Sequence, residues 1–328
     1  MRKVFIINIR SNSRTMAMFK NAIGAFDPSH LSDCEFVYTE YAGHASDIAR
    51  NTVSKAKIED GICDTLVIAC GGDGTIHEVA NCLAGTGVPM AVIPMGTGND
   101  FARSIMDEHH RKSAEYCVSE IINNDYEIRG TDLIKVESFD GNGNLIKESS
   151  AWCNNVASIG LDTEVQFAAK NKVLRKPDSN WVRKTAYITS ALSALFGNRS
   201  TEFKYKAIRG DGKAFESSSP RYTLISICNG GFYGSGFNPA PDANVSDGLM
   251  NVCAVNDVNL LKAIYLIVKY KNGKHYGMKD FDIFTTTEVT VTATGDKELR
   301  GNYDGEDFSG RECRFTLVKD GLKLAFYK

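Results

Sequence analysis

The sequence contains no apolar run that approaches the roughly 18 residues a membrane-spanning helix requires. Its N-terminus carries only a short apolar run, at residues 4–9, without a cleavage site after it. Cysteine motifs are also missing: nine cysteines lie scattered, and no Cys-x-x-Cys or Cys/His cluster suggests zinc. These absences predict a protein of a reducing compartment, and we expect a cytoplasmic one.

An excess of basic charge is missing too, because 38 lysines and arginines are offset by 40 aspartates and glutamates. Nucleic-acid-binding proteins usually carry a basic excess that neutralises phosphates, so we expect no nucleic-acid partner. Any phosphate site must therefore be local. With 328 residues, 43% of them hydrophobic, the chain can fill two cores, and its length favours two domains.

The hydrophobic pattern changes near residue 130. Before it, short apolar strands alternate with amphipathic stretches, as at 4–8 and 16–25, which predicts layered α/β structure. After it, alternating strands separated by turn pairs predict a β-rich domain, interrupted by helical spacing at 182–196 and 259–271. The predicted fold class is therefore α/β with two domains, an N-terminal layered α/β domain and a C-terminal β-rich domain.

A glycine-rich turn follows the apolar strand predicted at residues 65–70. The turn reads Gly71-Gly72-Asp73-Gly74-Thr75, and a helix is expected after it. Glycines let the backbone approach a ligand closely, and the N–H groups of the turn and of the helix N-terminus favour an anion. A purely structural connection can share this pattern, so the turn alone only favours a nucleotide-phosphate site.

The same arrangement recurs at a second turn. A short apolar strand at 91–95 is followed by Gly96-Thr97-Gly98, and Asn99 and Asp100 open the next predicted helix. Open α/β sheets bind ligands outside the carboxyl ends of their strands, so turns on neighbouring strands would face one crevice. Two such turns strengthen the prediction of a phosphate site.

The two turns closely resemble those of the diacylglycerol kinase catalytic-domain family, especially its soluble bacterial lipid kinases. The resemblance continues at 132–134, 154–162, 229–243, 247–249 and 304–306, and so spans nearly the whole chain. NAD kinases and phosphofructokinases share only the first turn. The resemblance implies that 312–328 return to the first domain. This gives a layered α/β nucleotide-binding domain at 1–130 with 312–328 and a C-terminal β-sandwich domain for the lipid substrate at 131–311.

By this resemblance, ATP binds to both glycine turns and to the ends of the first two strands. The family loop Asn-Pro-x-Ser-Gly is only partly matched after the first strand, because Ile9 and Asn12 replace its proline and glycine. The implied nucleotide-binding residues are Asn8, Ser11, Asn12, Thr39, Gly71, Gly72, Asp73, Gly74, Thr75, Glu78, Gly96, Thr97, Asn99 and Asp100. Asn81 lies one helical turn after Glu78, and we expect both to face the crevice.

Phosphoryl transfer also needs a divalent ion and a base near the acceptor hydroxyl. The resemblance places Asp304 and Glu306 in a cleft between the domains, and either can accept the proton of the lipid hydroxyl. It also implies a structural Mg²⁺ held by the Asp247 carboxylate and by carbonyls of Asn244 and Leu249. Without the resemblance, ordinary acidic turns explain both segments.

A basic stretch with apolar and aromatic residues begins at Lys170 and ends at Lys184. It can dock peripherally on the inner face of a membrane, because each lysine or arginine near an anionic leaflet contributes roughly 1 kcal/mol and Trp181 favours the interface. A solvated basic loop explains the same pattern. The resemblance also implies a homodimer.

The sequence therefore predicts an enzyme, an ATP- and Mg²⁺-dependent lipid kinase that phosphorylates a lipid hydroxyl, above all that of diacylglycerol to give phosphatidate. One alternative is a kinase for another lipid alcohol, such as a sphingoid base, a ceramide or phosphatidylglycerol. A second is an NAD-kinase-like small-molecule kinase, against which the missing Gly-Ser-Thr-Ala-Tyr stretch argues. A third is a non-catalytic nucleotide-binding regulator. The presence of Asp73, Asp247, Asp304 and Glu306 argues against it.

Overall fold

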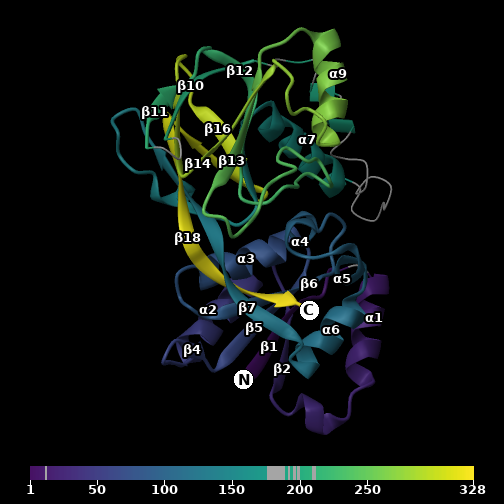
Figure 1. Ribbon diagram of the computed structural model, residues 1–328. Coiled ribbons are helices and arrows are strands. Elements are labelled where there is room, and N and C mark those ends of the chain that lie inside the picture. The colour runs from purple at the N-terminus through teal and green to yellow at the C-terminus, as the bar shows by residue number, and fades with distance from the viewer. Residues whose placement is uncertain (12, 176–188, 191–192, 195–196, 198–199, 209–211) are drawn as a thin grey trace. The chain divides into compact units, whose positions relative to one another are not determined.

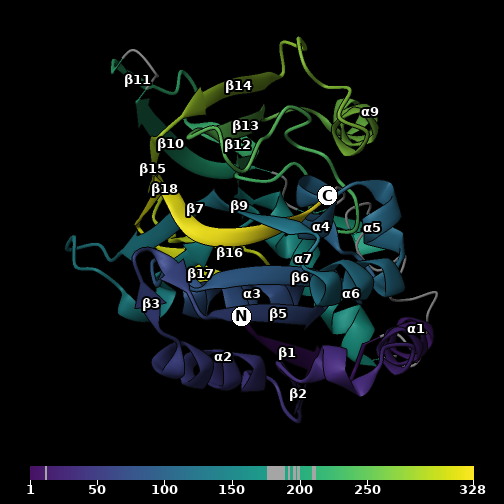
Figure 2. The same cartoon turned by 60° about the horizontal axis from the view of Figure 1, so that its bottom comes forward.

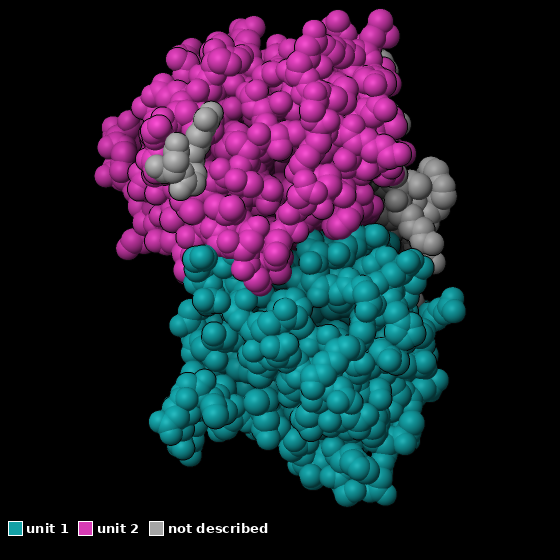
Figure 3. Space-filling view, in the orientation of Figure 1, with its two compact units in different colours: residues 1–133, 319–328 teal, residues 134–318 magenta. Residues whose placement is uncertain are grey.

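The computed structural model describes the chain except for residues 12, 176–188, 191–192, 195–196, 198–199 and 209–211. The chain divides into two compact units, residues 1–133 with 319–328 and residues 134–318 (Figure 3). Two long strands, β7 (Tyr126–Phe139) and β18 (Glu312–Tyr327), contribute to both units. The whole of 312–328 was expected in the first unit, but the first half of β18 pairs with β15 (Glu288–Ala293) in the second.

The first unit is built on a parallel sheet. Its strands run in the order β2 (Cys34–Thr39), β1 (Arg2–Asn8), β5 (Thr65–Gly71), β6 (Pro89–Pro94) and the end of β18, and β7 pairs with β18. Every residue of β5 and β6 is buried. Strands covered on both faces read as continuous apolar runs, which is why the sequence pattern of this unit is so clear.

Helices cover both faces of this sheet (Figures 1 and 2). α1 (Ser13–Gly24) packs with α6 (Ala114–Asn123), and α2 (His44–Lys55) packs with α3 (Asp73–Leu83). Phe19 of α1 and Val118 of α6 share one core with Phe5 and Ile68 of the sheet. The shorter elements are the 3₁₀ turn Pro28–Leu31, the hairpin of β3 (Ile58–Glu59) and β4 (Ile62–Cys63), α4 (Asp100–Ile105) and α5 (Glu108–Lys112).

The second unit is a sandwich of antiparallel strands. One layer contains β8 (Ala151–Cys153), β10 (Thr201–Ile208), β11 (Ala214–Glu216) and β15, with parts of β7 and β18. The other contains β9 (Val156–Gly160), β12 (Arg221–Cys228), β13 (Met250–Asn256), β14 (Phe281–Thr286), β16 (Leu299–Tyr303) and β17 (Glu306–Gly310). β10 pairs into both layers, and Phe203, Ile225 and Phe315 lie in the core that the layers share.

In the described part of the second unit, two helices pack on the outside of this sandwich. α7 (Leu161–Arg175) and α9 (Leu260–Lys271) enclose a smaller core with Leu224 and Val255 of the sheet. A 3₁₀ turn, Lys147–Ser149, precedes β8. The helical spacing at 259–271 corresponds to α9, whereas most of the stretch 182–196 lies outside the described residues. Among the described helices, none combines the length and the apolar character needed to cross a membrane.

Candidate active site

The two glycine turns meet backbone to backbone where β5 and β6 end. The Met95 N–H donates to the carbonyl of Gly71 at 2.7 Å. A Cβ on Gly96 would lie 2.5 Å from the Cα of Gly72, and two carbon atoms at that distance would clash. The close contact between the turns therefore explains why Gly72 and Gly96 carry no side chain, whereas their backbone dihedral angles do not require glycine.

Asp73 connects the first turn to the helix that follows the second. Its Oδ1 accepts a hydrogen bond from the Phe101 N–H at 3.1 Å, in the first turn of α4. Asn99 closes the second turn, because its Oδ1 accepts from the Gly96 N–H and its Nδ2 donates to the Gly96 carbonyl. Asn99 has φ of 52°, a left-handed conformation that asparagine tolerates better than most residues. Asp73 is therefore held beside the two glycine turns by an internal donor.

The loop after β1 is organised around Asn8. Its Nδ2 donates to Oγ1 of Thr75 at 2.8 Å, its Oδ1 accepts from the Arg10 N–H, and its carbonyl accepts from the Ser11 N–H. The Ser11 hydroxyl is buried and has no hydrogen-bond partner among the residues that the structure describes. An unpaired buried hydroxyl is costly unless a ligand satisfies it. Asn12 lies outside the described residues.

A hollow of about 170 Å³ opens beside these groups. Its lining consists of Asn8, Ile9, Arg10, Thr39, Glu40, Tyr41, Ala42, Ala45, Gly74, Thr75 and Glu78. The predicted residues Asn8, Thr39, Gly74, Thr75 and Glu78 are thus brought together. The other described ones, Ser11, Gly71, Gly72, Asp73, Gly96, Thr97, Asn99 and Asp100, lie outside this lining, in the loop after β1 and in the two joined turns. Ligand pockets usually measure about 300–1,000 Å³, so the hollow is smaller than a complete site for a ligand of ordinary size.

Two features of this hollow were missed by the sequence reasoning. Arg10 supplies a cation at its edge, directly after the predicted Asn8. The Tyr41 ring stacks on His44 with centroids 4.4 Å apart and planes 8° from parallel, which forms a flat aromatic surface. The Tyr41 hydroxyl donates to Asp47, and this hydrogen bond raises the pKa of Tyr41. The signal was the Tyr-Ala-Gly-His run between β2 and α2.

Of Glu78 and Asn81, the two residues expected to face the crevice, the structure places Glu78 in the lining of the hollow, whereas Asn81 is not part of that lining. Glu78 lines the hollow, and its Oε1 accepts from the Gly43 N–H at 3.3 Å. The Asn81 Nδ2 instead donates to the His77 carbonyl at 3.2 Å and contacts the buried His77 ring. The side-chain amide thus finds its partner one turn back along its own helix.

In the second unit, Asp304 and Glu306 flank the tight turn between β16 and β17. Oδ2 of Asp304 accepts the Asn154 N–H at 2.7 Å, and Oδ1 accepts the N–H groups of Asn155 and Val156 at 3.1 Å each. Glu306 is exposed. The two carboxylates therefore differ in kind: Asp304 anchors a neighbouring loop, whereas Glu306 projects outward.

Helix α7 holds the same turn from the other side. Gln166 and Lys170 both donate to the Gly305 carbonyl, the former at 2.7 Å. The Lys170 ammonium also lies 3.9 Å from Asp307. This lysine opens the predicted basic stretch, most of which, including Lys184, lies outside the described residues.

The predicted metal ligands lie on one exposed turn before β13. Oδ1 of Asp247 accepts the Leu249 N–H at 2.9 Å, and the Asn244 carbonyl faces the Asp247 N–H at 3.5 Å. Gly248 has φ of 77°, which brings these residues close together. In the part of the chain that the structure describes, no group of three or more His, Cys, Asp or Glu side chains could hold a metal ion. A site here would therefore combine one carboxylate with backbone carbonyls.

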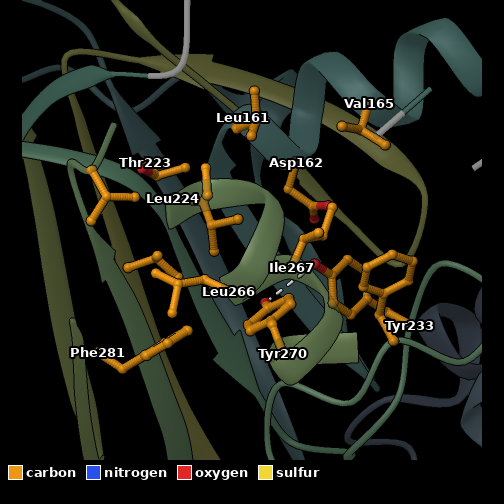
Figure 4. A pocket seen from close by; sticks show the side chains of 14 residues that line it. Leu161, Asp162, Val165, Thr223, Leu224, Tyr233, Leu266, Ile267, Tyr270 and Phe281 are labelled. Carbon is orange, nitrogen blue, oxygen red and sulfur yellow. Dashed lines mark hydrogen bonds between the residues drawn. The ribbon is translucent and has the colours of Figure 1, made fainter. Parts of the chain in front are cut away.

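An apolar cavity of about 60 Å³ lies between α7, α9 and the sheet (Figure 4). Its walls include Leu161, Val165, Leu224, Leu266 and Phe281. Polar groups converge on one side of it: the Tyr233 hydroxyl donates to that of Tyr270 at 3.2 Å, and the buried Asp162 carboxylate accepts from Ser158 at 2.7 Å. Burial raises the pKa of Tyr270 far above its usual range, so its hydroxyl stays protonated.

Comparison with known families defines the class of protein. Residues 2–136 match the family model of the diacylglycerol kinase catalytic domain, and residues 155–326 match that of the YegS C-terminal NAD kinase beta sandwich-like domain. Taken together, the two matched domains assign the chain to the lipid kinases. Residues 2–136 therefore form a diacylglycerol kinase catalytic domain, the chain belongs to the family with the YegS C-terminal domain, and the protein is a lipid kinase enzyme.

Individual relatives agree with this assignment. A diacylglycerol kinase of Bacillus subtilis (strain 168) is 29% identical over 274 residues, which cover 81% of this chain and 79% of the relative. A diacylglycerol kinase of Mycobacterium tuberculosis (strain ATCC 25618 / H37Rv) is 28% identical over 227 residues, which cover 69% and 65%. A solved structure from Bacillus anthracis str. Sterne superposes with a TM-score of 0.70 at 18% identity and covers 100% of this chain and 97% of that one, so the fold is shared.

Proposed function

We propose that this lipid kinase transfers the γ-phosphate of ATP to the hydroxyl of diacylglycerol, with Mg²⁺ bound, and yields phosphatidate. The observation that carries the proposal is the close contact of the two glycine turns at Gly72 and Gly96, together with Gly74 and Thr75 of the first turn in the lining of the hollow. Relatives named diacylglycerol kinase support this acceptor over other lipid alcohols.

In the proposed nucleotide site, each group has a chemical task. Backbone N–H groups of the two turns other than that of Gly96, which already donates to Asn99, bind phosphate oxygens together with the Arg10 guanidinium. Asn8 fixes Thr75 through their hydrogen bond, and the buried Ser11 hydroxyl finds its missing partner on the nucleotide. The stacked pair of Tyr41 and His44 offers a face for the base.

The oxygens of Asp247, Asn244 and Leu249 suit a hard cation, which prefers carboxylate and carbonyl ligands. Oδ1 of Asp247 is already engaged by the Leu249 N–H, so the second oxygen would face the ion. When bound at the nucleotide, Mg²⁺ offsets the charge that develops on the transferred phosphoryl group. Asp73, held in place by the Phe101 N–H, is the carboxylate of the first unit suited to this ion.

The acceptor hydroxyl needs a base, and Asp304 and Glu306 are the candidates. Asp304 is rigidly held by three N–H groups, which orients its carboxylate but also occupies it. Glu306 is exposed and keeps its oxygens available. We assign the proton transfer to this pair and leave the division of roles to experiment. The apolar cavity between α7 and α9, at about 60 Å³, has room for only a short part of an acyl chain.

The test is a transfer assay with purified protein, Mg²⁺, γ-labelled ATP and mixed micelles that contain diacylglycerol or one of the other lipid alcohols. We expect label in phosphatidate. Glu306→Gln and Asp304→Asn should each lower the rate at least about 100-fold if both act in proton transfer. Glu59→Gln, an exposed carboxylate in the β3–β4 hairpin, is the matched control and should leave the rate unchanged.

Other outcomes replace parts of the proposal. Label in a sphingoid base, a ceramide or phosphatidylglycerol alone would change the acceptor and keep the chemistry. Label in NAD and in no lipid would contradict the lipid acceptor. Tight ATP binding without any transfer would contradict catalysis. Peripheral membrane contact through the Lys170 to Lys184 stretch, a homodimer and a cytoplasmic location stay predictions, testable by lysine-to-glutamine variants, by light scattering and by cell fractionation.

A further inference from the structure

Helix α9 carries an apolar stripe that the described part of the chain leaves uncovered. Leu261, Ile264, Tyr265 and Val268 follow the spacing i, i+3, i+4, i+7 and are 82%, 37%, 53% and 57% exposed. The opposite side of the helix is also apolar, and Ala263, Leu266 and Tyr270 are buried in the core of the second unit. An exposed contiguous apolar stripe on a helix usually marks a contact site, so this stripe calls for an occupant.

The stripe is bordered by positive charge. Residues 257–280 contain five lysines (262, 269, 271, 274, 279) and two aspartates (257, 280), an excess of three positive charges in a chain whose net charge is −2. Lys274 and Lys279 are exposed, and Lys262 pairs with Asp280 at 2.7 Å. The Lys269 ammonium lies 5.4 Å from the centroid of the Tyr265 ring. The surface around the stripe therefore attracts an anionic partner.

This combination selects a lipid surface as the occupant. Interfacial helices bury leucine, isoleucine and aromatic side chains at the boundary between headgroups and acyl chains, while flanking lysines contact anionic headgroups. A second copy of the chain seated on the same stripe would bring the lysine borders of two α9 helices together, and like charges oppose that contact. The charge pattern thus argues for a membrane and against self-association.

The inner side of the same helix points to the same partner. Ala263, Leu266, Ile267 and Tyr270 line the apolar cavity of the second unit (Figure 4). Helix α9 therefore has the uncovered apolar stripe on its outer side and the apolar cavity on its inner side. We propose that α9 docks the second unit on an anionic bilayer by inserting Leu261, Ile264, Tyr265 and Val268. The purpose of this docking rests on the proposed function, but its test does not require catalysis.

The experiment is sedimentation of the full chain with phosphatidylcholine vesicles, with and without added phosphatidylglycerol. We expect binding to the anionic vesicles that weakens as salt is raised. The double variant Leu261→Glu/Val268→Glu should reduce the partition coefficient by about tenfold or more. Ile62→Glu is the matched control, because Ile62 is 71% exposed in the β3–β4 hairpin, and it should bind like the wild type. Lys274→Gln/Lys279→Gln should weaken binding to the anionic vesicles only.

Three results would overturn the docking proposal. They are a wild type that ignores anionic vesicles, a double variant that binds as well as the wild type, and a wild-type dimer that the double variant dissociates without any vesicle binding. Circular dichroism and the melting temperature of each variant exclude unfolding as the cause. Vesicle binding that depends on α9 without lipid phosphorylation would contradict the proposed function alone, whereas phosphorylation in micelles with unchanged vesicle binding in the variant would contradict the docking alone.

Discussion

At the scale of single residues, the glycine turns are where small changes have the largest expected effect. A Cβ at position 96 would lie 2.5 Å from the Gly72 Cα and 2.9 Å from Oδ1 of Asn99, so Gly96→Ala must push the turns apart. We expect a loss of about 1–3 kcal/mol in the free energy of unfolding and a marked loss of ATP affinity. Urea denaturation and nucleotide titration measure both quantities.

Gly74→Ala is the matched control for stability. A Cβ there meets no atom within 4 Å, and Gly74 lies inside α3, where alanine is the better helix former. We expect the free energy of unfolding to stay equal or rise by up to about 1 kcal/mol. If Gly96→Ala proved as stable as the wild type, the contact between the two turns would not be as close as described.

The acidic pair of the second unit gives the second prediction at this scale. Asp304→Asn replaces one of two accepting oxygens by a donor that faces N–H groups, so it should cost about 1–3 kcal/mol of stability besides any loss of rate. Glu306→Gln should change the rate with less than about 0.5 kcal/mol of stability, because Glu306 is exposed. Thermal unfolding of both variants beside the transfer assay separates anchoring from chemistry, and equal stability losses would contradict the distinction.

At the scale of elements, the start of α5 links stability to pH. Asp107 caps this helix: Oδ1 accepts from the His110 N–H at 3.0 Å and Oδ2 lies 2.9 Å from Nδ1 of His110. The backbone hydrogen bond first, and the side-chain one next, lower the pKa of Asp107. A carboxyl whose pKa is lower in the folded state stabilises the fold above its unfolded pKa, and that stabilisation is lost as pH falls through the folded value.

Asp107→Ala should therefore cost about 1 kcal/mol near neutral pH. The difference from the wild type should shrink as the pH falls below about 4, where the wild-type carboxyl protonates in the unfolded chain first. Denaturation curves at several pH values measure this trend. Asp257→Ala, an exposed aspartate before α9, serves as the control, and a pH-independent difference for Asp107→Ala would contradict the capping explanation.

At the scale of the whole chain, the last ten residues are decisive for the first unit. Residues 319–328 return to it, where β18 pairs with β6 and the Tyr327 hydroxyl donates to the Val92 carbonyl at 2.5 Å. The Tyr327 ring also stacks on His110 with centroids 5.1 Å apart. Burial raises the pKa of Tyr327 well above its usual range, which marks how far this end of the chain is enclosed.

A chain truncated after Val318 should therefore lose the order of its first unit. The deletion uncovers the edge of β6 and removes Leu322 and Leu324 from the core. We expect rapid proteolysis within residues 1–133 and a lost or strongly lowered unfolding transition. Tyr327→Phe, which removes only the hydroxyl, should cost about 0.5–1.5 kcal/mol. A truncated chain that unfolds like the full one would contradict this role.

The sequence by itself determined the strands and turns of the first unit, the change to a β-rich second unit, and the family. These depend on local patterns: apolar runs, glycines at strand ends, and turn pairs at short spacing. It also placed a helix at 259–271, within a residue of α9.

Only the tertiary structure decided which of these patterns meet. The hydrogen bonds of Asp73 to Phe101, of Asn8 to Thr75 and of Asp304 to the loop 154–156 join residues 28 to 150 positions apart, and no local pattern encodes such partners. The structure also shows that the Asn81 side chain donates to the His77 carbonyl of its own helix. For α9, the sequence places apolar residues on two sides of the helix. Which side is buried depends on the elements that pack against it after folding. The fold alone therefore decided which face packs inward and which remains to meet a partner.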